Sequence, residues 1–131
     1  MNTNFPKPFD VDNDPRFKDA LSLFNSGDWY PAHDAFEELW HETNGPERQT
    51  LQGLLQIAVA QVHLQRGNRN GATILFGEGL GRLRKIGTPS LGLDLEKLCD
   101  CVEQRLNTLH HEGDPEGCSV PVLLKKDSVA R

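Results

Sequence analysis

The sequence has few cysteines, and their spacing excludes the usual cysteine-based sites. Three cysteines occur in 131 residues and none belongs to a CxxC pair, so neither a metal motif nor a dithiol redox motif is predicted. Cys99 and Cys101 stand two residues apart on an expected helix, where their side chains would point in nearly opposite directions and could not share one ion. We expect all three cysteines to be reduced residues that fill packing positions.

Positive charge and long apolar runs are also scarce. The formal net charge of −5 argues against general nucleic-acid binding, which needs a basic face. No apolar run reaches the roughly eighteen residues of a membrane span, and the opening stretch MNTNFPKPFDVDNDPRF lacks the apolar core of a secretion signal. We therefore expect a single cytoplasmic globular domain with neither a nucleic-acid nor a membrane partner.

What the sequence does have is a series of helical patterns bounded by caps, prolines and glycines. The expected helices run from Asp14-Pro15 to Gly27, from Asp28 to Asn44-Gly45, from Pro46 to Arg66, from Gly67-Asn68 to about Lys85, and over Leu95–Leu109. These patterns predict an all-α, single-domain bundle of about five helices, built from two helical hairpins plus a C-terminal helix. The helical domain spans 14–112, between an N-terminal extension (1–13) and an irregular tail (113–131).

Two of these segments have patterns that bear on packing. The third helix has little polar circumference, which is typical of a central helix. In the tail, VPVLL either packs as an extended segment or belongs to a disordered end.

The glycine-rich stretch GEGLGRLRK, at 77–85, has two interpretations. A GxGxG string could indicate phosphate binding, but no strand precedes it and it lies at the end of a helix rather than at its start. We expect instead that Gly77 and Gly81 allow two helices to pack closely.

A weak internal repeat relates residues 24–40 to residues 64–80 by a shift of 40 positions. The matched pairs are Gly27 with Gly67, Asp28 with Asn68, Ala32 with Ala72, Phe36 with Phe76, and Glu38 with Glu78. Each copy is expected to form a helix, a Gly-Asx turn and a second helix, in which glycine supplies the left-handed turn. His33 and Glu37 have no counterpart in the second copy, so folding of the hairpin alone does not require them.

A row of polar residues on the second helix is the candidate site. His33, Glu37 and His41 are spaced four apart and therefore share one face, and Glu38 and His41 form a Glu-x-x-His pair. The third helix has a row of its own, which includes Gln56 and His63. Because a tight turn joins the two helices, we expect them to pack antiparallel, so that Gln56 and His63 could meet His33 and Glu37.

Such a cluster has three interpretations. Two imidazoles and a carboxylate suit zinc or another first-row ion. A carboxylate that holds an imidazole could also support acid–base chemistry. A hydrogen-bonded network that fixes the register of the helices is the favoured interpretation, because buried polar groups must be paired. A di-iron site is rejected, since it needs the Glu-x-x-His motif twice and two further carboxylates.

Residues 14–83 closely resemble domain-of-unknown-function family 309. The motifs AHDAFEELW, LQGLLQIAVA, the histidine at 63 and GNRNGA occur in the order of that family. The resemblance implies a small all-α fold of tetratricopeptide-like hairpins and implies no established activity. The positions that match the recurrent polar motif of the family are His33, Glu37, Glu38, Trp40, Gln56 and His63.

Two functions remain open at this point. The first is an interaction or scaffold module, with a protein partner or a second copy of the chain, in which the His/Glu/Gln cluster between helices two and three is structural. The second is a metal-dependent or acid–base enzyme, hydrolase-like, that uses His33, Glu37 and His63, with a single divalent transition metal as its candidate cofactor.

Overall fold

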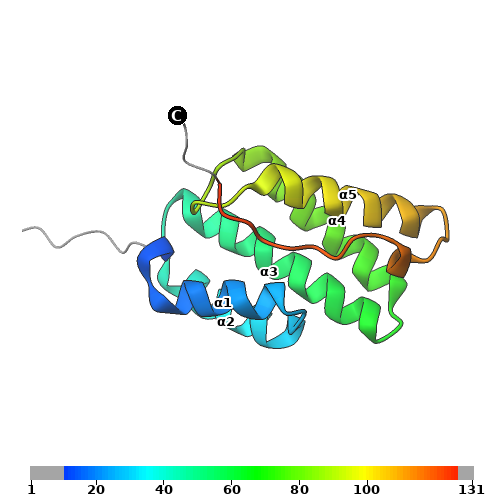
Figure 1. Cartoon of the computed structure of the whole chain (residues 1–131), viewed down its shortest axis with the longest axis horizontal. Coiled ribbons are helices and arrows are strands. Elements are labelled where there is room, and N and C mark those ends of the chain that lie inside the picture. The colour runs from blue at the N-terminus through cyan, green and yellow to red at the C-terminus, as the bar shows by residue number, and fades with distance from the viewer. Residues whose placement is uncertain (1–10, 127–131) are drawn as a thin grey trace, which may run out of the picture.

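Helices make up most of the chain in a computed structural model that describes residues 11–126 (Figure 1). Within this range there are five α-helices and two short 3-10 helices. They are η1 (Val11–Asn13), α1 (Pro15–Asn25), α2 (Trp29–Glu42), α3 (Pro46–Gln65), α4 (Arg69–Ile86), α5 (Leu95–His110) and η2 (Pro115–Gly117). The predicted all-α, single-domain architecture is confirmed. None of the helices in the described range combines the length and apolarity needed to cross a membrane.

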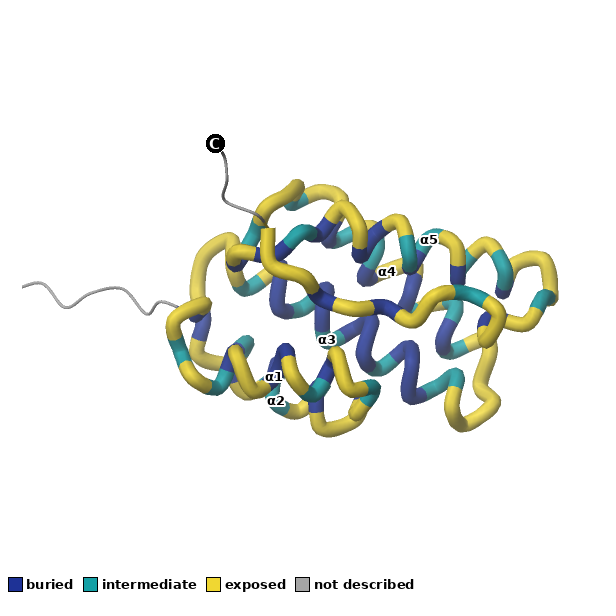
Figure 2. Tube along the Cα trace, in the orientation of Figure 1, coloured by how far each residue is buried: buried dark blue, intermediate teal, exposed yellow. Residues whose placement is uncertain are grey.

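The central position of α3 is also confirmed. It packs against α2 on one side and α4 on the other, with α1 beyond α2 and α5 beyond α4 (Figure 1). Buried positions follow one another along α3 (Figure 2), and its fully buried residues include Leu51, Leu54, Ile57, Ala58 and Ala60. Because neighbours cover α3 on several sides, the helix keeps little polar circumference.

The two Gly-Asx turns of the predicted repeat are built alike. Gly27 and Gly67 both adopt a left-handed φ, of 77° and 79°. In each turn the following Asx amide bonds back to the preceding helix, from Asp28 to the Leu23 carbonyl oxygen and from Asn68 to that of His63. This is the Schellman arrangement that ends a helix at glycine.

The close contact between α3 and α4 uses different glycines from those predicted. A Cβ built on Gly79 would lie 3.0 Å from Ile57 Cγ1 and 3.1 Å from the carbonyl oxygen of Gly53. Gly77 and Gly81 have no such neighbour within 4 Å, so the prediction that they mediate packing was wrong. The reason is helical phase, since Gly79 shares the buried face of α4 with Ala72, Phe76 and Leu83.

The tail packs against the helices as an extended segment, the first of the two alternatives for VPVLL. From η2 it crosses the bundle toward the opposite end (Figure 1). The Asn25 side chain holds it at Leu123, donating to the Leu123 carbonyl oxygen at 2.9 Å and accepting from the Leu123 amide at 2.7 Å. Leu123 is buried in the core, as is Val11 near the other end of the described range. Residues 1–10 and 127–131 of the predicted extension and tail lie outside the described residues.

Candidate functional site

The polar row of α2 brings His33 and Glu37 together and adds Asp34. His33 Nδ1 lies 3.2 Å from Asp34 Oδ1, and one ligand atom from each of His33, Asp34 and Glu37 lies within 4.8 Å of the other two. His33 and Glu37 are half-buried and Asp34 is exposed. Sequence reasoning missed Asp34 because it followed the four-residue spacing and passed over a neighbour in sequence. An imidazole and two carboxylates form a ligand set that suits zinc or manganese.

Gln56 makes its hydrogen bonds with α4 rather than with α2. Its Nε2 donates to Glu78 Oε1 at 2.9 Å, and its Oε1 accepts from Arg82 Nε at 3.1 Å. The amide thus bridges a carboxylate and a guanidinium of opposite charge, and Arg82 also donates to Gln49. We call these four side chains the Gln56 network. It joins α3 to α4, and both ends of the buried amide are satisfied.

His63 also bonds within the α3–α4 hairpin. Its Nδ1 lies 3.0 Å from Asn68 Nδ2, and because an amide nitrogen can only donate, His63 Nδ1 is the acceptor. Asn68 in turn accepts from the amide of Gly71 and so caps α4. The polar residues predicted to form one cluster between α2 and α3 therefore divide their hydrogen bonds between two places, with Gln56 and His63 bonded on the α4 side.

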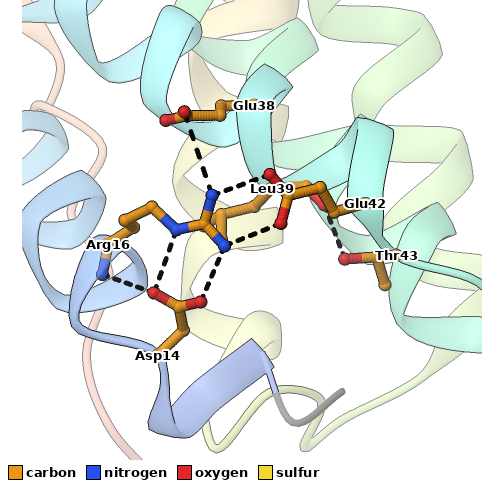
Figure 3. A network of polar contacts seen from close by, with 6 residues as sticks. All are labelled: Asp14, Arg16, Glu38, Leu39, Glu42 and Thr43. Carbon is orange, nitrogen blue, oxygen red and sulfur yellow. Dashed lines mark hydrogen bonds and ion pairs between the residues drawn. The ribbon is translucent and has the colours of Figure 1, made fainter. Parts of the chain in front are cut away.

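Glu38 belongs to an ion-pair network at the far end of α2 (Figure 3). Arg16, near the start of α1, donates to both carboxylate oxygens of Glu42 at 2.8 Å and to Asp14 at 2.8 Å, with Glu38 at 3.8 Å. Hydrogen bonds to Arg16 lower the pKa of Asp14 and of Glu42. The network fastens the start of α1 to the end of α2. Arg16 and Glu42 are 26 residues apart in the sequence, so helical spacing could not reveal their pairing.

Trp40 lies at the corner between α2 and α3. The guanidinium of Arg48 stacks 3.9 Å from its ring centroid, and Arg48 Nε donates to the Trp40 carbonyl oxygen. The indole Nε1 is buried without a hydrogen-bond partner among the described residues. The tryptophan thus joins two helices through its ring and main chain, as expected of a packing residue.

A second buried polar pair joins α3 to α5, and sequence reasoning missed it. Arg105 is 1% exposed, and its Nη1 donates to Gln61 Oε1 at 3.2 Å while its Nε donates to the carbonyl oxygen of Ser119 at 2.9 Å. The signal was present in the sequence, because Arg105 lies in the apolar stripe of α5 with Leu98, Val102 and Leu109. An ionisable residue in such a stripe is seldom accidental.

Two of the three cysteines have thiols of low reactivity. All three are free, as predicted. Burial raises the pKa of the Cys99 and Cys101 thiols, so both stay protonated and weakly nucleophilic at neutral pH.

The tail carries a row of exposed apolar side chains. Val120, Val122 and Leu124 are 52%, 41% and 45% exposed, whereas Pro121 and Leu123 between them are buried. The main-chain amide and carbonyl groups of Val120 and Val122 form no hydrogen bond within residues 11–126. We call residues 120–124 the tail edge. The unbonded main-chain groups of Val120 and Val122 resemble those that the outermost strand of a sheet presents.

A known family model and one known protein are similar to parts of this chain. The sequence model of the family described as Domain of unknown function (DUF309) matches residues 17–75. That match confirms the resemblance predicted from the motifs, and the DUF309 segment runs from α1 into α4. An uncharacterized protein of Aquifex aeolicus (strain VF5) is 26% identical over 100 residues, which cover 76% of this chain. The matched region spans 30% of that relative's own length.

Proposed function

We propose that the chain is a protein-interaction module that receives an extended segment of a partner polypeptide along the tail edge. One observation carries this proposal. The main-chain amides and carbonyls of Val120 and Val122 form no hydrogen bond within the described residues, and the side chains beside them are apolar and exposed. A partner strand would bond to these amides and carbonyls, and apolar residues at its alternate positions would cover Val120, Val122 and Leu124.

The fastening of the tail supports a rigid docking edge. Leu123 is held by Asn25, the Leu124 carbonyl oxygen accepts from the Asp94 amide, and the Lys126 amide donates to Gly92. Pro121 lacks an amide hydrogen, but it alternates with Val120 and Val122 and is on the opposite side of the strand. It therefore leaves their amides free for a partner.

In this proposal Gln56, His63 and Glu38 of the predicted polar cluster are structural. Gln56 and His63 tie α3 to α4, and Glu38 contributes to the Arg16 network. The length of the relative is consistent with a module, because the region similar to this chain is less than a third of that protein. The predicted cytoplasmic location and the absence of a nucleic-acid partner stay predictions.

Selection from a displayed library of random peptides tests the proposal. The peptides that bind should carry apolar residues at alternate positions, and methylating their main-chain nitrogens should abolish binding. Val122→Asp should weaken binding by about tenfold or more, since it places a charge in an apolar contact. Ile74→Asp, at an exposed apolar residue of α4, is the matched control and should bind as the wild type does.

Three outcomes would contradict the proposal. They are a library that yields no binders, binders with the three-to-four spacing of an amphipathic helix, and binding that Val122→Asp leaves unchanged. A dimer of the chain that Val122→Asp dissociates would place a second copy at the tail edge instead of a foreign peptide.

The second candidate function is binding of a divalent transition metal by His33, Asp34 and Glu37, favoured by the closeness of their ligand atoms. The ligand set predicted from the sequence was His33, Glu37 and His63. The group whose ligand atoms lie close together contains Asp34 instead of His63. Calorimetric titration with Zn²⁺ should give one site per chain that His33→Ala removes and His41→Ala, on the same helix, retains. Equal binding by the two variants would exclude this group as the ligand set.

A further inference from the structure

Arg105 is a buried cation without an anionic partner. Its two hydrogen bonds go to neutral oxygens, those of the Gln61 side chain and the Ser119 main chain. No ion pair joins it to a carboxylate within residues 11–126. The nearby Cys101 supplies no counter-charge, because burial raises the pKa of its thiol. A buried guanidinium is normally paired with a carboxylate, so the compensation here is incomplete.

Arg105 lines an open pocket of about 460 Å³. The pocket lies where the turn between α1 and α2, the end of α3, α5 and the tail come together. Its lining includes Trp29, Gln61, Leu64, Arg105, Glu116 and Val120. The volume is in the range of small-molecule sites, and Leu64 and Val120 offer apolar surface beside the guanidinium.

The unused polar atoms of the buried lining residues are donors. Because a guanidinium can only donate, the oxygen of Gln61 must face Arg105, and this leaves Gln61 Nε2 without a partner in the described range. Trp29 Nε1 also forms no hydrogen bond there, and besides Gln61 and Ser119 the Arg105 guanidinium interacts in this range only with the protonated thiol of Cys101. Side-chain acceptors in the lining belong to exposed residues, among them the carboxylate of Glu116 and the side-chain oxygens of Ser26 and Gln65. The buried part of the lining therefore has donors to spare, and a ligand that binds there needs an acceptor.

We propose that this pocket binds the carboxylate group of a small organic anion with an apolar body. The planar carboxylate matches the fork of the Arg105 guanidinium, and Gln61 Nε2 donates to the same group. Trp29, Leu64 and Val120 contact the apolar remainder. A singly charged carboxylate suits one guanidinium better than a phosphate dianion does, because Glu116 repels a second negative charge.

Trp29 is a built-in reporter for this site. The chain has two tryptophans, and Trp40→Phe leaves Trp29 as the only fluorophore of its kind. That change removes an indole nitrogen with no hydrogen-bond partner, so it should be tolerated. In this background, phenylacetate should alter Trp29 emission saturably, and neutral phenylacetamide should bind weaker by about tenfold or more. Sodium chloride at equal ionic strength controls for screening.

Gln61→Glu is the decisive variant. The change is isosteric and supplies a carboxylate from the chain itself to Arg105, so it should reduce phenylacetate affinity by roughly tenfold or more. Gln104→Glu, which adds the same charge at an exposed position beside Arg105, should bind as the parent does. Arg105→Lys, which keeps the charge and loses the fork, is the second variant and should also weaken binding.

Several results would overturn the proposal. They are the absence of a saturable response, equal binding of phenylacetate and phenylacetamide, tighter binding of inorganic phosphate than of phenylacetate, and undiminished affinity in Gln61→Glu.

Discussion

Two glutamines on α3, Gln56 and Gln61, are buried to the same degree, at 8% and 6% exposure, yet they belong to different kinds of network. Gln56 lies between a carboxylate and a guanidinium, and both ends of its amide are bonded. Gln61 accepts from the guanidinium of Arg105, and its amide nitrogen has no partner in the described range. In the Gln56 network the negative charge of Glu78 balances the positive charge of Arg82. The second network carries an uncompensated positive charge and spare donors.

The surroundings of the two glutamines explain the difference. Gln56 lies where α3 and α4 approach closely at Gly53 and Gly79, so α4 side chains reach it directly. Gln61 faces α5 and the tail, where a pocket opens and no carboxylate of the described range forms an ion pair with Arg105. A polar residue between helices can thus be a completed structural link or one half of a binding site. Counting its partners distinguishes the two cases.

The largest expected effect comes from removing the cation of the second network. Arg105→Met should lower the free energy of unfolding by about 2–4 kcal/mol, because the Gln61 and Ser119 oxygens both lose a buried donor. Arg82→Met, in the Gln56 network, should cost only about 1 kcal/mol, since Arg82 is half-exposed. Urea denaturation of the two variants measures this difference in the free energy of unfolding. Equal losses of stability would show that the two networks do not differ in the way described.

The next effect concerns the close approach that completes the Gln56 network. Gly79→Ala should destabilise the protein by about 1–3 kcal/mol, because the new Cβ would lie against Ile57 and the Gly53 carbonyl oxygen. Gly77→Ala, two residues away in open space, should raise stability by about 0.5–1 kcal/mol. Thermal unfolding should therefore shift in opposite directions. A stabilised Gly79→Ala would show that α3 and α4 are not tightly packed there.

A smaller effect concerns the tail that covers the second network. Asn25→Ala leaves the main-chain amide and carbonyl of Leu123 unpaired and should cost about 1–2 kcal/mol. Hydrogen exchange should accelerate at the Leu123 amide before it does so in α3. Asn107→Ala, at an exposed position of α5, is the control and should leave that exchange rate unchanged.

The smallest effect lies in the exposed network around Arg16. The pKa values of Asp14 and Glu42 are lowered by their hydrogen bonds to Arg16, so their contribution is present above the ordinary carboxyl range and is lost as pH falls through the lowered values. The stability difference between wild type and Arg16→Met should be constant near neutrality and shrink below about pH 4. High salt should reduce it as well. A difference that grows in acid would reverse the assigned sign.

Helix boundaries were predictable from local chemistry. Asp14 caps α1 by accepting from the amide of Arg16, and Gly27 and Gly67 take the left-handed turns that their positions imply. The buried face of α4 was also available in the sequence, since Ala72, Phe76 and Leu83 mark the stripe to which Gly79 belongs. The prediction about Gly77 and Gly81 was wrong because it did not ask which glycines lie on that buried stripe.

The direction of the polar row on α3 was not predictable in the same way. A helix that is apolar nearly all round has no polar face to fix its phase, so Gln56 and His63 could have faced either neighbour. The spacing of His33 and Glu37 on α2 predicted their closeness, because one helix determines it. The contact between Arg105 and the tail depends on tertiary packing, and no local pattern could identify Ser119 as its partner.

The same substitution at the two glutamines tests the account most directly. At neutral pH, Gln56→Glu should lower the free energy of unfolding by about 1–3 kcal/mol, because one new oxygen would lie against the Glu78 carboxylate, where the amide now donates at 2.9 Å. Gln61→Glu should leave stability unchanged or raise it by about 1–2 kcal/mol, because its carboxylate pairs with Arg105. Urea denaturation should therefore show a loss of stability for Gln56→Glu and no loss for Gln61→Glu. Equal destabilisation by the two would contradict the claim that Arg105 lacks an anionic partner.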